Sequence, residues 1–289
     1  MNVVLNTEPP KMDKKRKILY ALVIAICVLA ILISVYILLF KSNVEKVIEP
    51  PKYTPASDEE YLQKEEEFEN IFVNETVNQI GKSILITNKI KKEDEIIGIS
   101  YESTEKIIGK YSLNVKVPYI NINTTTVKEY NNQIEQIFKQ KALDIMNDSS
   151  SKDIVYTVDY IAYINENNIL SIAIRSILKE GNNAQRTIIQ TYNYDFQKNR
   201  EITLQDTLEL KGIKERDVET KVTEKIKKEQ AKVEELKKLG YSIFERDYTN
   251  DMYKVKNTTE FFLGKDNFLY LVYAYGNDNY TSELDLVIF

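Results

Sequence analysis

The sequence predicts an α+β protein with mainly antiparallel sheets and two amphipathic helices, preceded by one N-terminal transmembrane helix. Three observations support this prediction. An apolar run without a formal charge, Ile18–Phe40, lies near the N-terminus. Short runs rich in Val, Ile and Tyr, which favour strands, dominate the chain from residue 82 onward. Two longer segments, 126–146 and 213–239, carry apolar residues three or four positions apart, as helices with one buried face do.

The run Ile18–Phe40 is long enough to cross a bilayer, because about 20 helical residues span the hydrocarbon core. The apolar part of a cleaved signal peptide is shorter. Basic residues are concentrated before the run, at 11–17, whereas only Lys41 and Lys46 closely follow it. The positive-inside rule then places the N-terminus in the cytoplasm and the C-terminal domain outside the cell. We therefore expect a single-pass protein of the cell membrane that contacts lipid through Ile18–Phe40.

The two sides of this run differ in charge. Residues 1–17 contain five basic and two acidic side chains, and the chain totals of 39 and 44 leave 34 basic and 42 acidic side chains for the rest. An acidic outer part is a poor nucleic-acid binder, so no nucleic-acid partner is expected. It suits cationic proteins or metal ions, although the charge also has the simpler interpretation of keeping the domain soluble.

Composition and periodicity divide the chain into five parts. These are a cytoplasmic tip (1–17), the transmembrane helix (18–40), a linker with an acidic stalk (41–79), a small α+β subdomain (80–150) and a C-terminal α+β subdomain (151–289). Three prolines between residues 50 and 55 favour an extended linker. Ser57 and Glu60 form a capping-box pattern that predicts the start of a solvated stalk helix ending near Val77.

The remaining elements follow from strand-like runs and helix signals. Strands are expected at 83–90, 95–100, 111–120, 154–164, 170–178, 187–196, 260–263, 268–275 and 283–289. Thr126 and Glu129 form the capping box of the first amphipathic helix, and Thr203 with Asp206 begins a short helical turn. Gly240 is placed to end the second amphipathic helix in a left-handed conformation.

The residues that are missing exclude much chemistry. The chain has no His, and its one Cys, Cys27, lies inside the apolar run. His-based triads and His metal sites are therefore excluded, and so is an intramolecular disulfide. No phosphate loop or nucleophile elbow is present, and we expect no cofactor. The loop Asn277–Asn279 offers oxygen ligands for calcium without the spacing of a known site, so a plain turn is expected there.

Several runs resemble a known family. Val115–Asn123, followed by the helix with Tyr130, resembles a small domain of unknown function found in extracellular proteins of Gram-positive bacteria. Asn168–Ile174, Thr191–Phe196 and Ile202–Asp206 resemble its usual C-terminal companion. These two domains together, over about residues 80–289, are similar to the ectodomain of RsiV-type anti-sigma factors, which sense lysozyme. They also resemble the non-catalytic N-terminal region of a peptidoglycan deacetylase.

The chain departs from this family at two places. Gln185 stands where the family commonly has a histidine, so any role of that imidazole is lost. Residues 1–17 are too few to fold into a domain that holds a sigma factor. The resemblance therefore implies a ligand-binding outer domain without the anti-sigma role.

The candidate ligand-binding residues are Tyr192, Tyr194 and Gln185. The two tyrosines share one face of an alternating strand and, together with Tyr270, Tyr273 and Tyr275, could form an aromatic surface for glycan or protein. The alternative is that these rings pack the edge of a core with their hydroxyls in water.

These observations favour a binding or sensing module, not an enzyme. Its expected ligand is a cell-envelope component, such as a cell-wall glycan, or a cationic protein such as lysozyme. One alternative is a cell-wall glycan hydrolase or modifying enzyme that uses carboxylates, since 42 acidic side chains follow the tip. A Ser–Lys dyad is also possible. The other is a structural partner of another membrane protein. The sequence does not set the oligomeric state.

Overall fold

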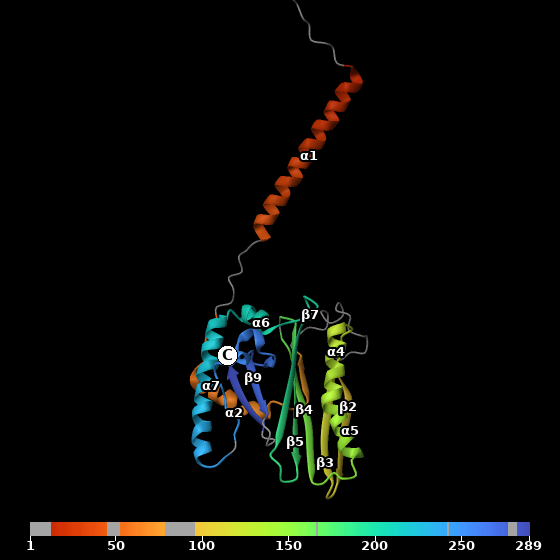
Figure 1. The fold of residues 1–289 in the computed structure, drawn as a ribbon. Helices are drawn as coiled ribbons and strands as arrows, with labels where there is room; N and C mark the ends of the chain where they lie inside the picture. The colour runs from red at the N-terminus through yellow and green to blue at the C-terminus, as the bar shows by residue number, and fades with distance from the viewer. Residues whose placement is uncertain (1–12, 45–52, 79–95, 166, 242, 277–281) are drawn as a thin grey trace, which may run out of the picture. The chain divides into compact units, whose positions relative to one another are not determined.

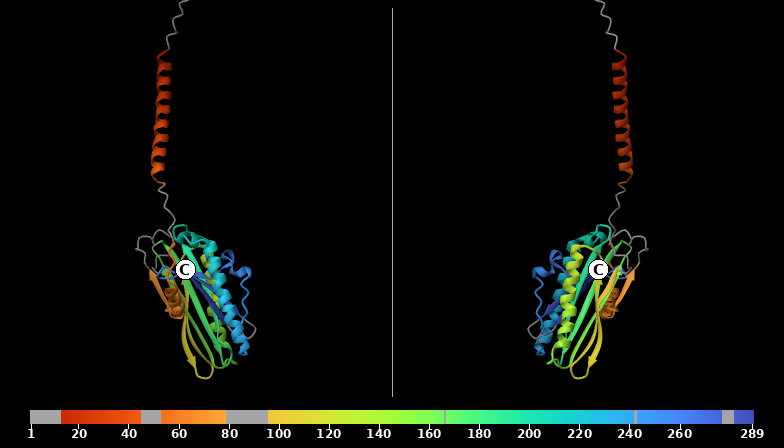
Figure 2. Two further views of the ribbon diagram at one scale, coloured as in Figure 1. Left: turned by 90° about the vertical axis from the view of Figure 1, so that its left-hand side faces the viewer. Right: turned by 90° about the vertical axis from the view of Figure 1, so that its right-hand side faces the viewer.

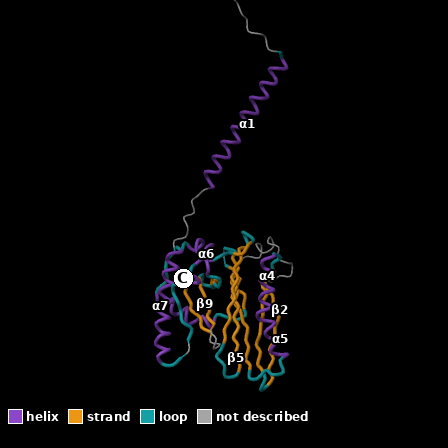
Figure 3. Tube along the Cα trace, in the orientation of Figure 1, coloured by secondary structure: helices purple, strands orange, loops and turns teal. Residues whose placement is uncertain are grey.

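The computed structural model describes residues 13–44, 53–78, 96–165, 167–241, 243–276 and 282–289 (Figures 1 and 3). The chain divides into two compact units, residues 1–50 and 51–289. The first contains one helix of 31 residues, α1 (Lys14–Val44), which includes the apolar run 18–40. Its large apolar side chains that are described lie exposed, for example Ile18 at 67% and Ile31 at 62%. The side chains of residues 20, 21 and 36–40 lie outside the described ones.

Over the described residues, the structure has no helix that combines the length and the apolar character needed to cross a membrane.

The second unit is built around a seven-stranded sheet and a three-stranded sheet. The large sheet has the order β2-β3-β4-β5-β6-β7, with β1 also paired to β4. Its strands are β1 (Glu75–Asn78), β2 (Ile97–Ile107), β3 (Tyr111–Ile120), β4 (Ile154–Ile164), β5 (Ile169–Glu180), β6 (Arg186–Asp195) and β7 (Arg200–Glu201). The small sheet has the order β10-β9-β8, formed by β8 (Phe261–Leu263), β9 (Leu269–Gly276) and β10 (Ser282–Ile288). The predicted α+β class with mainly antiparallel sheets is confirmed.

Two pairings in the large sheet are parallel, β3 with β4 and β1 with β4. Parallel neighbours need a long crossover, and the first amphipathic helix supplies it between β3 and β4. That helix consists of α4 (Thr125–Ile134), a π-helical turn (Glu135–Lys139) and α5 (Gln140–Asn147). The right-hand view of Figure 2 shows it lying along the strands of the large sheet.

Apolar residues form three buried clusters that order the layers. One lies between the α4–α5 helix and one face of the large sheet, for example Phe138 with Tyr156. A second lies between the two sheets and includes Ile189 and Phe262. The third lies between the other face of the small sheet and the helices α6 (Leu204–Lys211) and α7 (Glu215–Lys238). The sequence of layers is therefore helix, large sheet, small sheet, helix.

Several predicted helix ends are confirmed, and one is wrong. Thr203 and Asp206 form a complete capping box before α6, and Gly240 has the left-handed φ of 89°. The predicted Thr126 cap is wrong. The N-cap is Thr124, because its backbone is extended and its hydroxyl accepts the Val127 N–H at 3.4 Å.

The predicted solvated stalk is also wrong. Ser57 does cap a helix, α2 (Asp58–Glu67), but a 3-10 turn and then β1 follow it. Phe68 and Phe72 are 1% and 7% exposed, and they pack between the sheets. Glu65 lies 2.6 Å from Lys225 of α7. The acidic residues form only the outer face of a segment whose aromatic residues belong to the core.

The predicted subdomain boundary at residue 150 falls inside the large sheet, because β3 and β4 pair across it. The strands predicted at 111–120 and 154–164 match β3 and β4, and the later ones agree within two residues. The strand predicted at 95–100 is the start of the longer β2. The strand predicted at 83–90 lies outside the described residues.

Candidate functional site: a cleft beside strand β6

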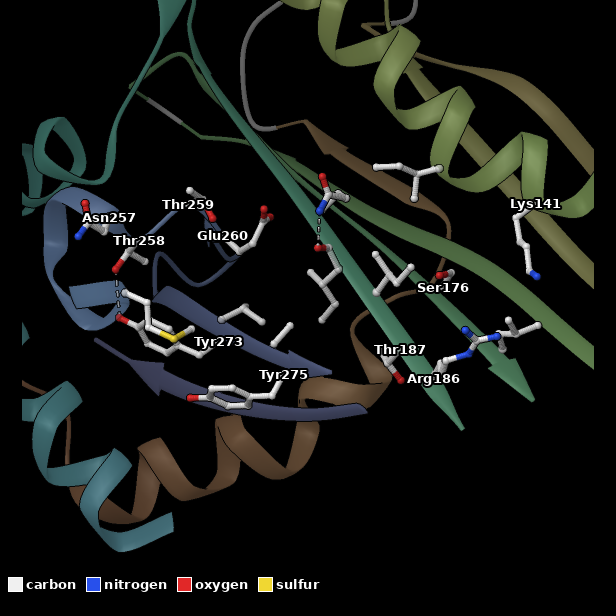
Figure 4. A pocket seen from close by; sticks show the side chains of 18 of the residues that line it. Lys141, Ser176, Arg186, Thr187, Asn257, Thr258, Thr259, Glu260, Tyr273 and Tyr275 are labelled. Carbon is white, nitrogen blue, oxygen red and sulfur yellow. Dashed lines mark hydrogen bonds between the residues drawn. The ribbon is translucent and has the colours of Figure 1, made fainter. Parts of the chain in front are cut away.

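A cleft of about 650 Å³ lies at the outer edge of β6 (Figure 4). The first half of β6, Arg186–Gln190, forms its floor. Ile137 and Lys141 of the α4–α5 helix line one side, and residues 257–260 with strand β9 line the other. Its volume lies within the range of pockets that hold small ligands in proteins.

The position of the cleft follows from how the two sheets join. The outer edge of β6 is covered only over its second half. There, Asn193 Nδ2 donates to the Phe261 carbonyl at 2.7 Å, and the Phe261 N–H donates to Thr191 Oγ1 at 3.0 Å. Ser171 Oγ accepts the Leu263 N–H at 2.7 Å from the neighbouring strand. These side-chain bonds hold β8 against one half of β6 and leave the other half to the cleft.

Glu260 carries the negative charge of the cleft. Its Oε2 accepts the backbone N–H of Thr191 at 2.7 Å. Burial raises the pKa of this carboxyl to about 6, against the hydrogen bonds from Thr191, which lower it. At neutral pH Glu260 is therefore largely ionised in a place where its charge is poorly solvated, and a cationic group would stabilise it.

Positive charge collects at the other end. Lys141 and Arg186 both contact Glu180, with N–O distances of 3.6 Å and 2.5 Å. Two cationic side chains thus meet at one carboxylate. The cleft thus has an acidic end beside Thr191 and a basic end beside the start of β6 (Figure 4).

The part of the opposite wall that Thr258 and strand β9 form is neutral and aromatic. The Thr258 and Tyr273 hydroxyls lie 3.1 Å apart, and those of Tyr253 and Tyr275 lie 2.8 Å apart. Burial raises the pKa of Tyr273 to about 12, so its phenol stays protonated at neutral pH. This wall offers hydroxyl groups and ring edges to a ligand, and no charge.

Acidic side chains are few among the residues that line the cleft. Among its described lining residues, Glu260 is the one carboxylate, whereas glycoside hydrolysis uses a pair about 5–10 Å apart. Within the described part of the chain, no group of three or more His, Cys, Asp or Glu side chains is placed to hold a metal ion.

The residues predicted to bind ligand are not brought together here. Tyr192 and Tyr194 are 5% and 1% exposed, and they pack beneath α4, where Tyr192 stacks on Tyr130 at 4.5 Å. These two rings form core and no exposed aromatic surface, as the alternative interpretation expected. Their hydroxyls do not lie in water as it also expected, because that of Tyr192 is buried and that of Tyr194 donates to Asn199. Gln185 is exposed in the turn just before Arg186, next to the basic end of the cleft, and its ligand-binding role stays a prediction.

Two other predicted features are the tyrosines of β9 and the loop 277–279. Tyr270, Tyr273 and Tyr275 are at most 4% exposed, because β9 is covered on both faces. Tyr273 and Tyr275 nevertheless line the cleft with part of their rings. The loop 277–279 considered for calcium lies outside the described residues.

The sequence analysis did not identify Glu260, Lys141 or Arg186. Each comes from a different element, and the cleft forms only when those elements pack together. Glu260 has one local signal, its position directly before the apolar strand β8, and it is one of the 42 acidic side chains that follow residue 17. No spacing rule selects it.

Seven chains of solved structures match this one, among them two DUF3298 family proteins. No family model matches the sequence. No curated protein matches it either. The chain is similar to a DUF3298 family protein from Pseudomonas aeruginosa PAO1, with 10% identity and a TM-score of 0.34 over 65% of this chain and 85% of that one. A DUF3298 family member from Bacteroides fragilis NCTC 9343 gives 13% identity and a TM-score of 0.33 over 66% and 87%. Similarity at this level does not assign the chain a function.

Proposed function

We propose that this chain is a membrane-tethered, extracytoplasmic binding or sensing module, and that the cleft beside β6 binds a cationic group of its ligand. The observation that carries the proposal is Glu260, a carboxylate with a raised pKa that lines the cleft of about 650 Å³. Among the described residues at the same end of the cleft, it has no cationic partner. An unpaired charge in such a place costs free energy, which a cationic ligand would recover.

A cationic protein fits this site better than an uncharged glycan does. The charge of the chain beyond residue 17 is net negative, with 34 basic and 42 acidic side chains, and this favours encounter with a basic partner. The resemblance of the sequence to lysozyme-sensing ectodomains points to the same class of ligand. We therefore choose lysozyme as the first probe and peptidoglycan fragments as the second.

Tethering at the membrane is the second part of the proposal. It is supported by the uncharged run 18–40 and by the basic residues that precede it. The run lies within the single continuous helix α1.

The test is calorimetric titration of the full-length chain in detergent micelles with lysozyme at pH 7.5. Glu260→Gln keeps an acceptor for the Thr191 N–H and removes the charge, and we expect it to weaken binding at least tenfold. The matched control is Glu66→Gln, the same change at an exposed position of α2, which should change the affinity less than twofold.

Two results would contradict the proposal. One is the absence of heat with both lysozyme and peptidoglycan fragments. The other is binding that Glu260→Gln leaves unchanged. The carboxylate-enzyme alternative makes a different prediction, namely that the chain cleaves or modifies cell-wall polymer and that one Asp or Glu substitution abolishes this activity.

A further inference from the structure

The first half of β6 has an outer edge that no strand of the described structure covers. β6 pairs with β5 from Arg186 to Asp195, whereas on its other side it pairs with β7 only at Tyr194 and Asp195. Between Thr191 and Asn193, β6 is linked to residues 260 and 261 by hydrogen bonds between a backbone group and a side chain. These bonds stand in place of strand pairing. The stretch Thr187–Gln190 borders the cleft instead.

The direction of the backbone groups in this stretch follows from Thr191. Its N–H donates to Glu260 and therefore points away from β5. In an antiparallel pair, the backbone groups of alternate residues point to the same side, so those of Thr187 and Ile189 also point away from β5, toward the cleft. The Ile189 carbonyl accepts only from the side chain of its neighbour Gln190, at 3.0 Å. Ile189 is 2% exposed, so an added strand would have to displace this side chain.

This edge lacks the features that usually block strand addition. Proteins protect edge strands with charged residues or proline, yet Thr187–Gln190 contains neither. Ile188 is 45% exposed within it. β2, at the opposite end of the sheet order, carries Glu102, Glu105 and Lys106. The sheet therefore places charges on one terminal strand and leaves the cleft side of β6 open.

The charges in the cleft also match a peptide with a defined direction. A strand added antiparallel to β6 would begin beside Thr191 and end beside Arg186. Its first residues would then lie near Glu260, and its last near Lys141 and Arg186. A peptide with a basic residue at its start and an acidic residue at its end would meet opposite charge at both places.

We propose that the cleft binds an extended peptide segment, which adds to the Thr187–Ile189 edge of β6 as an antiparallel strand with a basic residue at Glu260. This inference rests on the proposed function and specifies its ligand as a strand-forming polypeptide segment. Backbone hydrogen bonds would supply much of the affinity, and the charged ends would set the direction.

The test uses an acetylated and amidated peptide, Lys-Val-Thr-Val-Glu, titrated into the full-length chain in detergent micelles. Two further peptides carry N-methyl groups on their backbone amides. The first is methylated at its second and fourth residues, and the second at its third and fifth residues. In an added strand, alternate N–H groups face the sheet. We expect one methylated peptide to lose at least tenfold in affinity and the other to stay within threefold of the parent.

Variants of the protein test the same contact from the other side. Thr187→Pro removes an N–H that faces the cleft, a position where an edge strand tolerates proline. It should weaken binding of the parent peptide at least tenfold. Thr187→Ala keeps the N–H and should change the affinity less than threefold. Circular dichroism of both variants checks that the fold is retained. If Thr187→Pro fails to fold, the methylated peptides still test strand addition on the unchanged protein.

The possible failures are distinguishable. If both methylated peptides bind like the parent, or if the parent does not bind, strand addition is wrong, while Glu260-dependent binding of lysozyme would leave the proposed function standing. If lysozyme binding does not depend on Glu260, the proposed function itself is wrong.

Discussion

Glu260 is subject to two opposing effects on its pKa. Burial raises the pKa to about 6, and the Thr191 hydrogen bonds oppose that rise. The ordinary value for Glu is 4.5, so between these two pH values the folded chain binds more protons at this position than the unfolded chain. The free energy of unfolding must therefore fall as the pH rises through this window, and it should change no further from this source above it.

The expected size follows from the shift. A difference of about 1.5 pKa units corresponds to roughly 2 kcal/mol of unfolding free energy. Compared with Glu260→Gln, the unmodified chain should lose about this much stability between pH 4 and pH 7. Urea unfolding of both proteins across that range measures it, and the Glu66→Gln variant serves as the control for a surface carboxylate. A constant difference between the two proteins would show that Glu260 titrates normally.

The two buried arginines of the described structure have carboxylate partners. Arg246 is 8% exposed and contacts both oxygens of Asp285, at 2.8 Å and 3.0 Å, and Glu283 at 2.5 Å. Although burial opposes it, these hydrogen bonds and charges raise the pKa of Arg246, so the guanidinium stays charged. Arg175 is bound in a similar way by Asp159 and Glu69. Glu260 differs from these residues because its hydrogen bonds come from uncharged groups.

At the scale of elements, the acidic helix α2 shows why its segment resembles a solvated stalk in the sequence. Its charges lie on the outer face, and its contribution to the core comes from aromatic residues that follow it. Phe68 packs on Phe72 with ring centroids 5.4 Å apart, and on Phe262 and Tyr270 at 6.3 Å and 6.1 Å. The pattern of charges is visible in the sequence, whereas Phe262 and Tyr270 lie roughly 200 residues away along the chain.

We predict that Phe68→Ala lowers the free energy of unfolding by roughly 3–5 kcal/mol, because it leaves a cavity among buried rings. Leu62→Ala on α2 is the control. Leu62 is 56% exposed, so its truncation should cost less than about 0.5 kcal/mol. Urea unfolding followed by circular dichroism measures both. Equal effects of the two substitutions would mean that this segment is a free stalk after all.

For the whole molecule, local patterns predicted elements well and their assembly poorly. The alternation of Val, Ile and Tyr gave β3 and β4 at their observed bounds, and the Thr203–Asp206 capping box gave the start of α6. The layer order depends on which faces pack together, as with Ile189 against Phe262, and single-strand periodicity does not encode that. The cleft has the same origin, because Lys141, Arg186 and Glu260 meet only after the sheets join.

The membrane anchor is the largest-scale expectation, and it concerns residues 1–50 alone. The run Ile18–Phe40 has no formal charge, and insertion of such a run is favourable because each apolar residue contributes a few tenths of a kcal/mol. An Arg near the centre of a spanning helix costs about 2.5–3.5 kcal/mol. Ile26→Arg combined with Leu29→Arg should therefore abolish insertion, whereas Glu66→Arg combined with Glu245→Arg, both at exposed positions, should have no effect.

Fractionation after alkaline carbonate washing distinguishes these proteins. We expect the unmodified chain and the surface variant in the membrane pellet, and the Ile26/Leu29 variant in the supernatant or degraded. Protease added to intact cells should then remove the folded domain of the unmodified chain, because the positive-inside rule predicts a cytoplasmic N-terminus from the five basic side chains before the run. Recovery of the unmodified chain in the soluble fraction, or protection of its domain from the protease, would contradict the anchor. The cleft beside β6 would then face the cytoplasm, where lysozyme does not reach it.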